Sequence, residues 1–358
     1  MTAITSLPFP PAPSSSLRLQ LDPHALAANW QVLHAMSGSA AAGAAVKADA
    51  YGLGAARVSQ VLWAAGCRDF FVAHWGEVAD ILPHVPADRI AVLHGPRNQE
   101  EAAYARATGV RPVLNSLEQA RRWLDSGGGP CHLMVDTGMS RLGLAMDDIG
   151  DEALSRLEID ICLSHLASAD EDVPQNEVQR GRFAVVRTAV AAQRYSLANS
   201  AGIALGSGYH ADVTRPGISL YGGVVRPEFS GKISQVARPE AAIVQVRMLQ
   251  RGDKVGYNAL FSADRPMRVG VLTLGYADGY LRCWTGRGKF EWNGKELQVL
   301  GRISMDLTIV DISSVPDCGE GDWLTASYDL SDAAQASGLS QYELLTGLGR
   351  RFSRQFEH

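Results

Sequence analysis

The stretch RPVLNSLEQARRWLDSGGGPCHLMVD, residues 111–136, contains the unit from which the fold can be predicted. Its two ends, RPVLN and CHLMVD, are short apolar runs of the kind found in buried strands. The segment between them begins with a good N-cap residue, Ser116, and has Glu118 close behind it, which indicates a helix. A buried strand, a helix and a second buried strand predict a unit with parallel strands.

The same alternation extends from residue 43 to residue 222, with helix-like stretches between most of the apolar runs. The runs are AAVK (44–47), FFVAH (70–74), IAVLH (90–94), RPVLN (111–115), CHLMVD (131–136), ICLSHL (161–166), YSLAN (195–199) and HADVT (210–214). About eight strand–helix units predict a closed (β/α)₈ barrel of the TIM type and not an open sheet.

Near residue 235 the pattern changes to β-branched, alternating runs such as RVGVLTL and LTIVDI. Asn293-Gly294 between two alternating runs indicates a hairpin. We therefore predict an α/β fold in which a barrel over residues 17–235 is followed by a mostly β domain over residues 236–358. Residues 1–16 lack the basic and apolar regions of a signal peptide, so we expect a disordered tail there.

The composition excludes several classes of protein. A chain of 358 residues with 46% hydrophobic residues is long enough to bury a large core. The net charge of -5 argues against nucleic-acid binding, and no apolar run is long enough to span a membrane. Five scattered cysteines without zinc-like spacing indicate reduced thiols, no metal site and a cytoplasmic location.

Lys47 ends the first predicted strand, within AVKADAYGLG at residues 45–54. The C-terminal ends of the strands form the active site in barrels of this type. Partial burial lowers the pKa of a lysine and frees its amine to form a Schiff base with a carbonyl cofactor. Taken alone, a surface lysine at the start of a loop explains the residue equally well.

Two glycine-containing motifs follow the seventh and eighth predicted strands. They are NSAG (199–202) and RPGISLYG (215–222), and barrels commonly bind phosphate there through backbone N–H groups. Ordinary turns would account for either motif separately. Both motifs together, opposite a candidate Schiff-base lysine, favour an aldehyde that carries a phosphate, and pyridoxal phosphate fits.

With further motifs the chain resembles the alanine racemase family of pyridoxal phosphate enzymes, from about Leu17 to Phe356. The motifs are AVKADAYGLG, VDTGMSRLGL (135–144), SHLASADE (164–171), NSAGI (199–203), RPGISLYG, VGYNALF (255–261), LGYADGY (274–280) and GRISMD (301–306). The resemblance implies that the N-terminal strand, at about residues 17–22, joins the β domain.

The resemblance also implies roles for the cofactor-binding residues. Lys47 bonds to the cofactor and is one catalytic base. Tyr257 is the second base, supplied by the other subunit of a head-to-tail homodimer that shares its active sites. His165 packs beside the cofactor ring, and Arg215 hydrogen-bonds the ring nitrogen. The remaining cofactor contacts fall on Tyr51, Asn199, Ser200 and the backbone of Gly217 and Ile218.

The substrate side is implied in the same way. Arg141 reaches the cofactor's phenolic oxygen and the substrate carboxylate, which the backbone of Met305 from the other subunit also meets. Positions around the entrance or its support are Asp170, Tyr276, Arg282, Arg302 and Asp306. Taken singly, His165 also fits a structural histidine, Tyr257 a core residue and Arg141 a surface ion pair.

The chain departs from the family pattern at three positions. Met134 replaces a lysine that is often carbamylated and supports the active-site arginine, so we expect Arg141 to be oriented by a small anion such as chloride, or to be looser. Phe356 stands where we place a family tyrosine that touches the phosphate, and the loss of its hydroxyl would cost about 0.5–1.5 kcal/mol. Leu53 replaces a frequent histidine, to which we assign no consequence.

The resemblance predicts racemisation of L- and D-alanine by two bases, which supplies D-alanine for peptidoglycan. Four alternatives stay open: a racemase for another amino acid such as serine, a decarboxylase on the same fold, a non-catalytic carrier of the cofactor, and a weakly active paralogue. Tyr257 and RPGISLYG argue against a decarboxylase, and the β domain argues against a carrier, which lacks one.

Overall fold

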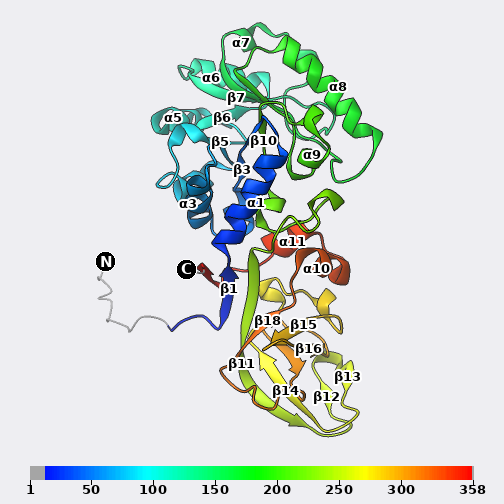
Figure 1. Cartoon of the computed structure of the whole chain (residues 1–358). Helices are drawn as coiled ribbons and strands as arrows, with labels where there is room; N and C mark the ends of the chain where they lie inside the picture. Colours follow the sequence, from blue (N-terminus) through cyan, green and yellow to red (C-terminus); the bar gives the residue numbers. More distant parts are fainter. Residues whose placement is uncertain (1–12, 357–358) are drawn as a thin grey trace, which may run out of the picture.

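The computed structural model describes residues 13–356, which form a barrel joined to an elongated β domain (Figure 1). The barrel part contains β2 (Ala41–Ala42), β3 (Ala44–Ala45), β4 (Phe70–Val72), β5 (Ile90–Val92), β6 (Arg111–Leu114), β7 (Pro130–Met134), β8 (Glu158–Leu163), β9 (Arg194–Ser196) and β10 (Val213–Thr214). The β domain contains β1 (Leu17–Leu21), β11 (Ala237–Leu249), β12 (Lys254–Val255), β13 (Phe261–Ser262), β14 (Met267–Leu272), β15 (Lys289–Trp292), β16 (Lys295–Leu300), β17 (Thr308–Asp311), β18 (Trp323–Ala326) and β19 (Ser353–Phe356).

Most helices accompany the barrel strands. They are α1 (Pro23–Met36), α2 (Lys47–Tyr51), α3 (Ala55–Ala65), α4 (Val78–Ile81), α5 (Gln99–Thr108), α6 (Leu117–Asp125), α7 (Glu152–Ser155), α8 (Pro174–Ala189) and α9 (Ser200–Ala204), with α10 (Leu330–Ser337) and α11 (Gln341–Thr346) near the C-terminus. Helix α6 begins as predicted, because the Ser116 side chain accepts a hydrogen bond from the Gln119 N–H at 3.2 Å. It then buries Ala120 and Trp123.

The predicted barrel is confirmed. Strands β3 to β9 form one parallel sheet in sequence order. Strand β10 closes the ring: it pairs in parallel with β2, and beyond β9 Asn199 and Arg215 form a parallel bridge. The first strand is split into β2 and β3 at Gly43, where a Cβ atom would lie 2.7 Å from the Asp69 carbonyl oxygen. The backbones therefore approach too closely for a side chain.

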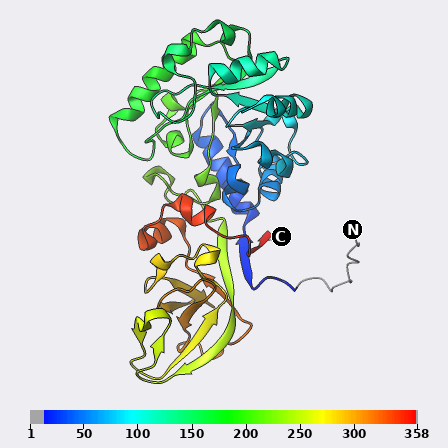
Figure 2. The same ribbon diagram turned by 180° about the vertical axis from the view of Figure 1, so that it is seen from behind.

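The β domain is built on one mostly antiparallel sheet. Its sheet runs β14-β17-β16-β15-β18-β11-β1-β19, and β14 also pairs with β11. The predicted hairpin joins β15 and β16, with φ of +48° at Asn293 and +77° at Gly294. Strand β1 pairs antiparallel with β11 and parallel with β19, so the N-terminal strand lies beside the C-terminus in both views (Figure 2).

The predicted disordered tail requires a correction at its end. Residues 1–12 lie outside the described part of the chain, but Ser15 and Ser16 are held by the β domain. The Ser15 hydroxyl donates to the Arg351 carbonyl oxygen at 2.6 Å, and the Ser16 carbonyl oxygen accepts from the Ala242 N–H at 3.0 Å. Within residues 13–356, no helix is long and apolar enough to cross a membrane.

Candidate active site

A cavity of about 880 Å³ opens where the barrel strands end. Many of the predicted site residues line it together, although they come from segments far apart in the sequence. These residues are Lys47, Tyr51, Arg141, His165, Asp170, Asn199, Ser200, Arg215, Gly217 and Ile218. Motifs that follow successive strands in the sequence therefore lie around one cavity, as expected for the C-terminal face of a barrel.

Lys47 begins a turn with unusual backbone geometry. The next four residues, 48–51, have φ between 52° and 57°, in the left-handed region. Such a conformation costs about 1–2 kcal/mol per residue, so four in succession must be held by their surroundings. The Asp49 side chain accepts a hydrogen bond from the Ala55 N–H at 2.7 Å, and the Ala50 N–H donates to the Val46 carbonyl oxygen at 2.8 Å.

The surroundings of Lys47 favour its neutral form. Burial lowers the pKa of the Lys47 amine, the charges of Arg141 and Arg215 lower it further, and Glu77 opposes them. None of the carboxylates among residues 13–356 forms an ion pair with this lysine. A neutral amine is the form that attacks a carbonyl carbon or accepts a proton.

Arg215 is a buried cation bonded to neutral groups. Its guanidinium donates to the Ser196 hydroxyl and to the carbonyl oxygens of Ser164 and Leu197. Burial lowers its pKa to about 10, so it still carries its charge at neutral pH. A buried charge without a counter-ion is costly, which favours an electron-rich or anionic ligand in the cavity.

Ser200, Gly217 and Tyr51 form a cradle suited to a phosphate. The Ser200 hydroxyl accepts hydrogen bonds from the Gly217 N–H at 2.9 Å and the Ser219 N–H at 3.4 Å, which leaves its own hydrogen to donate. A Cβ atom on Gly217 would lie 2.3 Å from the Tyr51 hydroxyl oxygen. The Ser200 hydroxyl hydrogen, the Tyr51 hydroxyl and the absence of a side chain at Gly217 fit the phosphate of pyridoxal phosphate.

His165 is a neutral group in the cavity wall. Burial and the nearby charges of Arg215, Arg141 and Lys47 lower its pKa to about 3. Its backbone carbonyl oxygen accepts a hydrogen bond from the Gln179 side chain at 2.9 Å, which holds this end of β8 against α8. The ring therefore offers an uncharged, flat surface beside the cations at neutral pH.

Arg141 lies on the loop after β7, and Asp136 shapes that loop. The Asp136 carboxylate accepts from the N–H groups of Gly138 and Met139 at 2.8 Å and of Arg141 at 3.1 Å. Burial raises the pKa of Asp136, but these bonds outweigh it and lower the pKa overall. Met134 is only 6% exposed and packs in the apolar barrel interior, and Arg141 forms no ion pair with a carboxylate of residues 13–356.

The other predicted residues do not line this cavity. Tyr257, Tyr276, Arg282, Arg302, Met305 and Asp306 lie in the β domain. Contacts join some of them: the Ala277 N–H bonds to the Met305 carbonyl oxygen at 2.9 Å, the Arg282 guanidinium lies 4.9 Å from the Tyr276 ring centre, and a Cβ atom on Gly256, next to Tyr257, would lie 3.3 Å from the Arg302 carbonyl oxygen. We call these six residues the β-domain cluster. Its Tyr257 is 62% exposed and its Met305 53% exposed.

The prediction for Phe356 needs correction, because its ring does not line the cavity. It pairs with Leu21 at the end of β19, and Arg57 lies 5.7 Å from its ring centre. Besides Tyr51, Tyr342 of α11 lines the cavity, with its ring centre 6.2 Å from that of Tyr51. Burial and the charge of Asp170 raise the pKa of Tyr342 to about 12. The error arose because α11 and β19 follow each other closely in the sequence and only the fold separates them.

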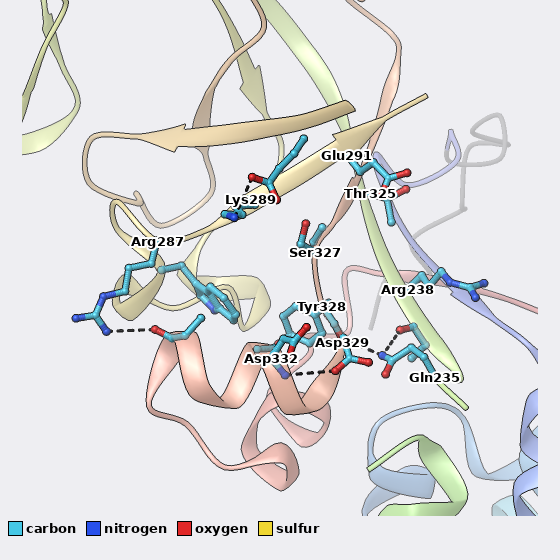
Figure 3. A pocket seen from close by; sticks show the side chains of 16 residues that line it. Gln235, Arg238, Arg287, Lys289, Glu291, Thr325, Ser327, Tyr328, Asp329 and Asp332 are labelled. Carbon is cyan, nitrogen blue, oxygen red and sulfur yellow. Dashed lines mark hydrogen bonds and ion pairs between the residues drawn. The ribbon is translucent and has the colours of Figure 1, made fainter. Parts of the chain in front are cut away.

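A second cavity, of about 500 Å³, lies in the β domain and contains none of the predicted site residues (Figure 3). Several of its charged side chains are bonded within the chain. Lys289 pairs with Glu296 at 2.9 Å, Asp329 caps α10 by accepting from the Ser331 N–H, and Arg287 donates to the Ala336 carbonyl oxygen at 3.2 Å. In the part of the chain that the structure describes, no cluster of three or more histidine, cysteine or acidic residues has a metal-binding arrangement.

Known proteins resemble this chain over nearly its full length. Residues 21–225 match the family "Alanine racemase, N-terminal domain", and residues 236–356 match "Alanine racemase, C-terminal domain". An alanine racemase of Acidiphilium cryptum is 42% identical, with 94% of this chain and 97% of the relative covered. A biosynthetic alanine racemase of Agrobacterium fabrum is 40% identical, with 95% and 93% covered. The alanine racemase of Bartonella henselae, solved with covalently bound pyridoxal phosphate, is 33% identical and has a TM-score of 0.87, with 96% of this chain and 100% of that chain covered.

Proposed function

Because the chain belongs to the alanine racemase family, we propose that it is a pyridoxal phosphate enzyme that interconverts L- and D-alanine. The observation that supports this most directly is the barrel cavity. There Lys47, with a lowered pKa, faces Arg215, which has no counter-ion, and the phosphate cradle of Ser200 and Gly217. The B. henselae relative carries its cofactor covalently, and Lys47 is the group in this cavity suited to such a bond.

The residues of the cavity fit the cofactor at both ends. Ser200, Tyr51 and the backbone of Gly217 and Ile218 would hold the phosphate, and Arg215 would donate to the ring nitrogen. When bound, pyridoxal phosphate makes the Cα–H of an attached amino acid acidic. Arg141 would hold the substrate carboxylate, because its guanidinium has no protein counter-ion. Arg215 keeps its proton at neutral pH and therefore acts as a donor and not as an acid.

Racemisation requires a proton to leave one face of Cα and another to arrive on the opposite face. We propose that Lys47 serves the D-side proton and that Tyr257 of the partner subunit serves the L-side proton. The exposure of Tyr257 and Met305 supports this, because both side chains lie at the surface and neither lines the chain's own cavity. A head-to-tail homodimer would bring one subunit's cluster to the other subunit's cavity.

The shared site can be tested by mixing two inactive variants, Lys47→Ala and Tyr257→Phe. If each site uses both subunits, mixed dimers contain one intact site, and activity recovers to about a quarter of the wild-type value after subunit exchange. Sites contained within one subunit would give no recovery. Dilution through dissociation with unchanged specific activity would also contradict the shared site.

The activity itself is tested by the loss of optical rotation of L-alanine, with L-serine and L-lysine in parallel and pyridoxal phosphate added. Fast loss with alanine alone is the expected result, and it would show that Met134 is tolerated. Absence of loss with all three, despite bound cofactor, would overturn the proposal. A role in D-alanine supply for peptidoglycan predicts that loss of the gene makes growth depend on added D-alanine.

A further inference from the structure

Glu77 bonds to the backbone at the start of the left-handed turn. It ends the short 3-10 helix Trp75–Glu77, which follows β4. One carboxylate oxygen accepts from the N–H of Ala48, the residue directly after Lys47. The other accepts from the N–H groups of Ala73 at 2.7 Å and His74 at 2.9 Å. A single side chain thus ties the end of β4 to the residue beside Lys47.

These bonds bear on a segment that cannot hold its shape alone. Ala48 is the first of four successive residues with positive φ, a conformation that the chain avoids without external support. Three hydrogen bonds to one carboxylate are stronger than bonds to a neutral acceptor, because the acceptor is charged. Glu77 is therefore placed to set the direction in which the Lys47 side chain leaves the backbone.

Glu77 also differs in charge from the groups around the amine. Arg141 and Arg215 both act on Lys47 as positive charges, whereas Glu77 acts as a negative charge. Its carboxylate does not form an ion pair with Lys47, so the interaction is longer in range than a salt bridge. It raises the pKa of the Lys47 amine against burial and the two arginines.

We propose that Glu77 is a positioning residue for Lys47, which fixes the turn that carries the lysine and the direction of its side chain. The assignment rests on the proposed role of Lys47 in binding the cofactor and moving a proton. A glutamate that merely caps a helix would support the fold without affecting either the direction or the charge state of that amine. The two possibilities differ in measurable ways.

The test compares the full chain with Glu77→Gln and Glu77→Asp, and with Glu320→Gln as a matched control. Glu320 also accepts from a backbone N–H, that of Val246 at 3.0 Å, but in the β domain. After removal of the cofactor, acetic anhydride is added over a pH series, and the acetylation of Lys47 is followed by peptide mass spectrometry. We expect the midpoint of acetylation to fall by roughly half a pH unit or more in Glu77→Gln, because the stabilising charge is gone.

Kinetics of the loaded enzyme give the second measurement. In Glu77→Gln we expect kcat to fall by about tenfold or more with little change in KM. The substitution misdirects Lys47 but leaves the groups that bind the substrate in place. Glu77→Asp keeps the charge but shortens the side chain, so it should leave the acetylation midpoint near the wild-type value and still lower kcat. If Glu77→Gln fails to fold, Glu77→Asp alone tests the geometric part.

The outcomes separate this proposal from the proposed function. If the Glu77 variants only lower Tm, with the acetylation midpoint and kcat as in the wild type, Glu77 is a cap and the proposal is overturned. If wild-type protein lacks racemase activity but Glu77→Gln shifts the midpoint, the proposed function fails and the positioning role stands. Glu320→Gln should change neither measurement, and a shift there would mean that the effect is not specific to Glu77.

Discussion

The barrel cavity and the β-domain cavity differ in how their cations are paired. In the barrel cavity, Lys47 and Arg141 form no ion pair with any carboxylate of residues 13–356, and Arg215 donates only to neutral oxygens. In the β-domain cavity, Lys289 forms an ion pair with the Glu296 carboxylate, although Arg287, like Arg215, donates to a carbonyl oxygen. Cations without counter-ions favour an anionic ligand, whereas a lysine that is paired with a carboxylate offers an anion little.

The backbone conformation also differs between the two cavities. Four successive residues after Lys47 adopt positive φ at the barrel cavity. None of the described residues that line the β-domain cavity has a positive φ. Strain persists only where the surroundings enforce it, and it is concentrated at functional sites.

The largest expected difference is between the two cavity lysines. Lys47→Ala should lower racemase activity by more than about 10⁴-fold, because it removes both the cofactor bond and a base. Lys289→Ala removes one exposed ion pair and should change activity by less than about twofold. Polarimetry and the visible absorbance of bound cofactor give both results. Equal losses in the two variants would remove the functional distinction between the cavities.

A smaller but still large effect is expected at Gly217. Gly217→Ala puts a Cβ atom 2.3 Å from the Tyr51 hydroxyl oxygen and fills the phosphate cradle, so cofactor affinity should fall by about 10- to 100-fold. Gly319→Ala is the control, because nothing lies within 4 Å of its added Cβ atom. Equilibrium dialysis against pyridoxal phosphate measures both. Unchanged affinity in Gly217→Ala would place the phosphate elsewhere.

Acid should destabilise the barrel through two buried histidines. Burial is the main cause that lowers the pKa of His165 to about 3 and of His132 to about 4. Since both folded values lie below the unfolded value of about 6.5, the unfolded chain binds more protons between those limits, and stability falls as the pH drops from about 6.5 toward 4.

We expect each of these histidines to contribute about 2 kcal/mol of this loss by pH 5. His132→Asn keeps an acceptor for the Ile161 N–H, which now donates to His132 Nδ1 at 3.1 Å, and it should flatten the pH dependence. Denaturant unfolding at pH 7 and pH 5 measures the change. The same slope in wild type and variant would show that His132 is charged in the folded protein or does not contribute.

The smallest effects concern the two aromatic residues near the C-terminus. Tyr342→Phe removes a hydroxyl from the cavity and should change cofactor affinity or kcat by a few-fold, as expected for one hydrogen bond. Phe356→Tyr should leave both within about twofold, because Phe356 lies outside the cavity. Tighter cofactor binding in Phe356→Tyr would restore the role that we first expected at that position.

The sequence predicted much of the site because residues that directly follow the strands of a parallel barrel lie together at one end of it. Lys47, His165, Asn199, Ser200 and Arg215 each follow a strand, and parallel strands bring their ends to one face. Tyr342, Asp136 and Glu77 were missed. Tyr342 reaches the cavity only because α11 folds back onto α2, and the other two act on backbone N–H groups that no sequence pattern identifies.

The amino-acid sequence by itself determined the alternation of strands and helices, the Asn293-Gly294 hairpin and the residues at the strand ends. These features depend on local periodicity and on the conformational preferences of single residues. Only the tertiary structure decided that β10 closes the ring against β2 and that Glu77 holds the turn after Lys47. Each of these depends on hydrogen bonds between residues distant in the chain, whose free energy is available only after the rest of the fold has brought them together.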